Sequence, residues 1–161
     1  MVTRRTLLFG TATLVSGLSG CIATQRSSSP QVVCAAGIDS GDSNPVFSLT
    51  PTVRSFGANT NPVVELVVPI RQAVVESQNV RELVVFSESE VRYRIPVSPN
   101  DDPVGETNRY DTDDVVEYAQ SLGHVPQNGV YRLVALDGDG ESLDEDRIDF
   151  RCYRVVDEES D

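Results

Sequence analysis

The stretch VRYRIPV, at residues 91–97, decides the fold class. Apolar side chains occupy its odd positions, and arginine, arginine and proline occupy its even positions. Successive side chains of a β-strand point to opposite faces, so this alternation predicts a strand with one buried face and one face in water. Pro96 has no N–H group to donate to a neighbouring strand. We therefore expect this strand to lie at the edge of a sheet, or to end at the proline.

Valine dominates the rest of the chain, with 25 valines against 11 leucines. Branched side chains at Cβ suit a pleated sheet and lose rotamer freedom in a helix, so this bias indicates a mainly β protein. Runs bounded by Gly, Pro, Asn and Asp mark the individual strands. The predicted strands are residues 32–37, 46–56, 63–70, 82–87, 91–97, 130–137 and 147–155.

Turn-forming residues stand between several of these runs, at 58–61, 87–90 and 137–140. Short connections of this composition predict hairpins, so consecutive strands are expected to be antiparallel neighbours. The Asp- and Pro-rich stretch at 98–107 predicts a loop.

One helix is predicted at residues 113–122. Thr112 would cap its start, acidic residues occupy its first turn and Gly123 would end it. Its apolar stripe would be Val115, Tyr118, Ala119 and Leu122.

About seven short strands, a helical turn before the penultimate strand and the run GVYRLVA at 129–135 resemble immunoglobulin-like or fibronectin-type sandwiches. The resemblance is one of architecture and covers residues 31–156. It implies an immunoglobulin-like antiparallel β-sandwich.

The first 21 residues predict an exported lipoprotein. Arg4 and Arg5 precede a short apolar stretch, which ends at Leu18-Ser19-Gly20-Cys21. Charge, a short apolar core and small residues before a cysteine follow the order of a cleaved signal, and the core is too short to span a bilayer. The segment resembles the twin-arginine lipoprotein signals of salt-loving archaea. This resemblance implies cleavage before Cys21 and a lipid on its thiol.

The expected organisation is a signal peptide at 1–20, a Ser/Thr-rich tether at 21–30, one domain at 31–156 and an acidic tail at 157–161. The lipid would hold the protein on the extracellular face of the cell membrane.

The charge balance indicates adaptation to salt. The whole chain carries 13 arginines, no lysine and 25 acids. Residues 1–20 hold two arginines and no acid, so the mature chain has 11 − 25 = −14 charges. High ionic strength screens repulsion within such a surface. Nucleic acid is not an expected partner, because no clustered basic face is visible.

The chain has three cysteines. Lipidation would use Cys21, which leaves Cys34 and Cys152 as a candidate disulfide in an exported protein. Both have core-facing parity on the first and last predicted strands. The alternative is a pair of buried free thiols.

No catalytic or cofactor site is complete in the sequence. A blue-copper site needs two histidines and usually a methionine, but the chain has only His124 and Met1. Gly41-Asp42-Ser43 lacks the histidine and aspartate partners of an esterase and is better explained as a turn. Asp137, Asp139 and Glu141 form a weak cation candidate, with a polar hairpin tip as the alternative.

We therefore expect a non-catalytic binding or structural module of the cell envelope, without a cofactor. Its partners would be the membrane, through the lipid on Cys21, and an envelope protein or glycan. The alternative function is a hydrolase that depends on a cation or uses another unrecognised site in the carboxylate loops.

Overall fold

The computed structural model describes residues 31–38, 45–57, 60–105 and 109–155. Outside these residues lie the predicted signal peptide with Cys21, the tether and the acidic tail. The predicted turn at Gly41-Asp42-Ser43 also lies outside them. The described elements are β1 (Gln31–Ile38), β2 (Thr52–Phe56), β3 (Val63–Arg71), α1 (Gln72–Ser77), β4 (Val80–Ser87), β5 (Glu90–Pro96), β6 (Val115–His124), β7 (Gln127–Asp137) and β8 (Ser142–Val155).

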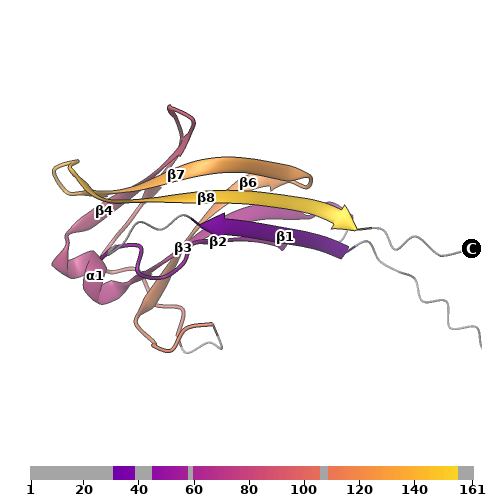
Figure 1. Cartoon of the computed structure of the whole chain (residues 1–161). Coiled ribbons are helices and arrows are strands. Elements are labelled where there is room, and N and C mark those ends of the chain that lie inside the picture. Colours follow the sequence, from indigo (N-terminus) through magenta and orange to yellow (C-terminus); the bar gives the residue numbers. More distant parts are fainter. Residues whose placement is uncertain (1–30, 39–44, 58–59, 106–108, 156–161) are drawn as a thin grey trace, which may run out of the picture.

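These strands form two sheets (Figure 1). The larger has the order β1-β8-β7-β4-β5, and the smaller has the order β2-β3-β6. All neighbouring strands are antiparallel, and side chains from both sheets enter one core. The predicted mainly β, antiparallel sandwich is therefore confirmed. Hairpins join β2 to β3, β4 to β5 and β7 to β8, as the turn residues predict.

Alternation along each strand builds the core. On β8, Ile148, Phe150 and Cys152 are at most 2% exposed, while the residues between them are exposed. Tyr131 on β7 packs at this level, with its ring centroid 6.5 Å from that of Tyr93 and 5.4 Å from that of Phe150. The three rings join β5, β7 and β8 by edge and tilted contacts, which aromatic pairs prefer.

The strand predicted at residues 91–97 is observed as β5, but Val91 is 45% exposed next to the hairpin turn, so the shielded face begins at Tyr93. Strand β5 is the last strand of the larger sheet and ends at Pro96. Tyr93 and Ile95 are shielded, whereas Arg92, Arg94 and Pro96 are exposed. Pro96 has no N–H group, and an edge strand tolerates this because no further strand lies on its outer side.

The helix predicted at 113–122 is wrong, because this segment forms strand β6. It pairs with β3 from Val115 to His124. Val116, Tyr118 and Leu122 are buried at even positions, while Ala119 of the expected helical stripe is exposed. The long ladder with β3 and the period-2 burial outweigh the local helical pattern. The described residues therefore form eight strands, and a strand rather than a helix precedes β7.

The single described helix, α1, is only six residues long and connects β3 to β4. The expected strand at 46–56 is also too long, since only Thr52–Phe56 is extended in a sheet. Pro51 immediately precedes the observed strand, and a proline is accepted at a strand start but not inside a ladder.

Asp144 holds the segment before Pro51 against the core. Its Oδ2 atom accepts hydrogen bonds from the backbone N–H of Val46, at 2.9 Å, and of Phe47, at 3.2 Å. Both apolar side chains are buried, and Asp144 is itself 8% exposed. A carboxylate is tolerated at this depth because backbone donors satisfy it.

Candidate functional site

The predicted lipidation residue Cys21 and signal residues Arg4, Arg5, Leu18, Ser19 and Gly20 lie outside the described residues. The structure does show where the domain starts. Gln31 pairs with Val155, so β1 begins at the end of the sandwich where β8 finishes (Figure 1). Among the described residues, no helix has the length and apolar character needed to cross a bilayer.

Cys34 and Cys152 form the predicted disulfide. The two residues face each other in the β1–β8 ladder, with their Cα atoms 4.1 Å apart. This separation is slightly below the 4.4 to 6.8 Å usual for a disulfide but close to the value for a non-hydrogen-bonded antiparallel pair, about 4.5 Å. The bond therefore joins the first and last strands side by side.

The cation candidate at the β7–β8 hairpin is a closed polar turn. Oδ1 of Asp137 accepts hydrogen bonds at 2.9 Å from the backbone N–H groups of Asp139 and of Glu141. The Asp137 N–H donates to the carbonyl of Glu141, at 3.0 Å, and Gly140 takes the left-handed conformation. The Asp137 carboxylate thus stabilises the turn, as expected if this motif is a polar hairpin tip.

Within the described ranges, no group of three His, Cys, Asp or Glu residues is arranged to hold a metal ion. His124 is exposed at the end of β6. The acids near 111–114 were expected at a helix start, but no helix begins there. Asp114 instead contacts the Thr112 hydroxyl, and its N–H donates to the same oxygen at 3.2 Å.

A network of ion pairs crosses the outward face of the smaller sheet. Arg54 lies 2.8 Å from Glu65 and 3.1 Å from Glu117. The other oxygen of Glu117 accepts from Arg109, at 3.1 Å, and from the Tyr110 hydroxyl, at 2.9 Å. This cluster connects β2, β3, β6 and the loop before β6.

The network changes the titration of two of its members. For Arg54, burial lowers the pKa, but the hydrogen bonds and charges of Glu65 and Glu117 outweigh it, so the pKa is raised. Burial, then the hydrogen bond donated to Glu117, raises the pKa of Tyr110. Every carboxylate of the cluster has a cationic partner, so the arrangement can brace the sheet but holds no unpaired acid or base for catalysis.

The outward face of the larger sheet carries three shallow, open hollows that share lining residues. The first, about 320 Å³, is lined by Glu88, Val130, Arg132 and Arg147. The second, also about 320 Å³, is lined by Gly37, Ile38, Arg147 and Asp149. The third, about 490 Å³, is lined by Ala35, Ala36, Gly37, Asp149, Phe150, Arg151 and Tyr153. We call these three hollows together the β8 groove.

The arginines of the β8 groove have different surroundings. Arg132 and Arg147 face each other directly across β7 and β8. Arg132 is held in place, since its guanidinium lies 4.4 Å from the centre of the Phe86 ring and 3.0 Å from Glu145. Among the described residues, neither Arg147 nor Arg151 has an ion pair. Like charges directly opposite each other destabilise a sheet, and Glu145 pairs only with Arg132 of the two arginines.

No protein-family model, curated protein or solved structure matches the chain. The sequence reasoning missed both the Glu117 network and the β8 groove. The signal available for the groove was the period-2 order Arg147, Asp149 and Arg151 on a predicted strand. The opposition of Arg132 to Arg147 depends on strand register, which the sequence does not specify.

Proposed function

We propose that this protein is a lipid-anchored module of a salt-adapted cell envelope, exported by the twin-arginine route and displayed on the extracellular face. It acts by binding rather than by catalysis. The observation that carries the proposal is the lipobox Leu18-Ser19-Gly20-Cys21 after the paired arginines. This order of features is the one that export and lipidation machinery reads.

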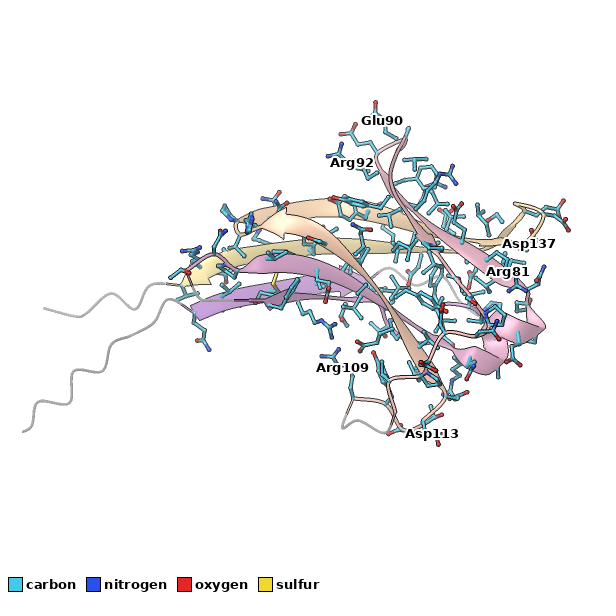
Figure 2. All side chains as sticks on the ribbon, turned by 180° about the vertical axis from the view of Figure 1, so that it is seen from behind. Arg81, Glu90, Arg92, Arg109, Asp113 and Asp137 are labelled. Carbon is cyan, nitrogen blue, oxygen red and sulfur yellow. A yellow bond between two sulfur atoms is a disulfide. The ribbon has the colours of Figure 1, made fainter. Side chains whose placement is uncertain are left out.

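The geometry of the domain supports display on a tether. Cys21 lies ten residues before Gln31, where β1 starts. Figure 2 places Asp137 and Arg81 at the end of the sandwich opposite the start of β1 and the end of β8. A lipid at Cys21 would thus hold one end of the sandwich near the membrane and leave the opposite end and both outward sheet faces accessible.

Replacing Cys21 with Ser tests the anchor. We expect the Cys21→Ser protein to leave the membrane fraction, because the lipid supplies the membrane affinity, at about 0.8 kcal/mol for each buried methylene. Ser19→Ala is the matched control, since it keeps a small residue before the cysteine, and it should remain anchored. An exported Cys21→Ser protein that stays with membranes would contradict the assignment.

The export route has a separate test. Substitution of both Arg4 and Arg5 by lysine keeps the charge of the segment but removes the arginine pair. We expect this variant to accumulate inside the cell with its signal still attached. Mass spectrometry of the N-terminus in cell and envelope fractions measures the outcome, and normal processing of the lysine variant would exclude the twin-arginine route.

A further inference from the structure

The β8 groove gathers three arginines, Arg132, Arg147 and Arg151, beside two carboxylates, Glu88 and Asp149, in an otherwise acidic chain. The net charge is −12, yet three of the 13 arginines line this one face. Along β8 the outward positions follow the order Arg147, Asp149, Arg151 and Tyr153, all exposed. A surface selected only for acidity and hydration has no need to concentrate arginines in a hollow.

The floor of the groove is built from small residues of β1. Gly37 pairs with Asp149, and Ala35 pairs with Arg151, both on the outward side. A Cβ atom placed on Gly37 would meet no other atom within 4 Å, so space is open above it. The β4–β5 hairpin forms a wall: Glu88 lines the first hollow, and Figure 2 shows Glu90 and Arg92 at a tip that rises beyond the sheet.

The opposed arginines define where a negative group fits. Arg132 is fixed by the Phe86 ring and by Glu145, so little side-chain entropy is lost when its remaining donors bind. Arg147 presents a guanidinium that no described residue pairs. A carboxylate or sulfate between the two side chains would accept charge-assisted hydrogen bonds and remove their repulsion.

We propose that the β8 groove binds an anionic polysaccharide, with one acidic group of the sugar chain seated between Arg132 and Arg147. This inference rests on the proposed envelope location and specifies the partner. Asp149 decides the class of anion, because it lies between Arg147 and Arg151 and would repel a densely charged polymer. A sugar chain offers hydroxyl groups that can donate to this carboxylate.

Tyr153 lies at the far end of the groove. This residue is 43% exposed and lines the third hollow together with Arg151. An exposed aromatic ring offers an apolar surface with a hydroxyl handle, which suits the C–H face of a sugar ring. The groove thus offers a carboxylate site, a hydroxyl acceptor and an aromatic surface in line along one strand.

The test titrates a hexasaccharide of glucuronic acid into the mature chain carrying Cys21→Ser. Binding is measured from NMR amide chemical shifts in high salt. We expect saturable shifts at groove residues such as Val130 and Asp149. Arg147→Gln should raise the dissociation constant at least about tenfold, since a hydrogen bond to a charged group contributes on that order. Arg71→Gln, on the opposite sheet, removes the same charge and should leave the affinity unchanged.

A second variant blocks the groove without removing charge. Gly37→Val should fold, because the site is open and lies in a strand, but its side chain would occupy the floor and weaken binding. Equal binding of a neutral glucose hexasaccharide, or tighter binding of an oligoaspartate peptide, would overturn the proposal. So would unchanged affinity in Arg147→Gln. None of these results affects the fractionation test of Cys21→Ser. The experiments therefore distinguish a groove that does not bind the polysaccharide from a protein that is not lipid-anchored.

Discussion

Oδ2 of Asp144 lies 2.9 Å from the backbone nitrogen of Val46, although the two residues are 98 positions apart in the chain. This hydrogen bond, with a second one to Phe47, connects the segment between β1 and β2 to the start of β8. The described part of this segment, residues 45–51, pairs with no strand, so the Asp144 side chain supplies the hydrogen bonds that a neighbouring strand supplies elsewhere.

Removal of this carboxylate should destabilise the domain. In Asp144→Ala two buried N–H groups lose their acceptor, and each unsatisfied buried donor costs about 1 to 3 kcal/mol. We expect the free energy of unfolding to fall by about 3 kcal/mol in urea titrations at high salt. Asp144→Asn keeps an oxygen acceptor and should lose less. Asp139→Ala, at the exposed hairpin tip, is the control, and an equal loss there would refute the role of Asp144.

The disulfide should make a large contribution to stability. It joins residues 118 positions apart, and closing a loop of about 100 residues stabilises a fold by up to about 4.7 kcal/mol in the chain-entropy model. A Cys34→Ala/Cys152→Ala variant should unfold at clearly lower urea concentration. Reducing agent should lower the stability of the parent chain and leave the double variant unchanged; equal stability of both oxidised proteins would contradict this expectation.

Salt should stabilise the domain, because the chain carries 25 acids against 13 arginines and a net charge of −12. The Debye length grows from about 3 Å at 1 M salt to about 10 Å at 0.1 M, so repulsion among carboxylates returns on dilution. We expect the melting temperature to fall between these concentrations. Sodium chloride and potassium chloride at the same ionic strength should restore it equally, because they screen charge equally. A melting temperature that stays constant on dilution would show that charge repulsion does not limit this fold.

Tyr118 should make the free energy of unfolding depend on pH in the alkaline range. Burial, followed by the nearby Asp101 carboxylate, raises the pKa of its hydroxyl above the ordinary 10.0, although no described group lies in full hydrogen-bonding geometry to this hydroxyl. The folded state therefore keeps a proton that the unfolded state releases. The stabilisation is complete below pH 10 and is lost as the pH rises through the folded-state pKa.

Tyr118→Phe removes this linkage. We expect the variant to be as stable as the parent at pH 7, because no described group lies in full hydrogen-bonding geometry to the lost hydroxyl, and to lose less stability above pH 10. Burial also raises the pKa values of Tyr110 and Tyr131, so some alkaline dependence should remain. Tyr153→Phe, at an exposed position, serves as the matched substitution. Parallel pH profiles for the parent and Tyr118→Phe would exclude the effect.

The sequence predicts best those strands whose two faces meet different environments. Strand β5 alternates arginine with apolar residues, and β8 alternates charge with Ile148, Phe150 and Cys152, so period 2 was evident. Strand β6 was mistaken for a helix because Val115, Tyr118 and Leu122 also fit a helical stripe. Its long pairing with β3 is a tertiary property that local spacing does not contain.

The functional features divide in the same way, into those that depend on local sequence and those that depend on which strands pair. The disulfide is predictable because the number of cysteines and the alternation of side chains along each strand can be read directly from the sequence. The Glu117 network and the β8 groove are not, because they depend on which strands become neighbours. Arg132 and Arg147 are 15 positions apart in the sequence, and only the β7–β8 register places them opposite each other.

The Cys34–Cys152 bond also determines how the domain would carry mechanical load. A force applied through a lipid tether enters β1 at Gln31 and reaches the cross-link three residues later. From there it passes covalently into β8, which is flanked by β1 and β7 in the larger sheet. Peeling of β1 from its edge would therefore stop at Cys34. A partner held in the β8 groove would pull on the same strand, so tension between cell surface and partner would bypass most of the sandwich.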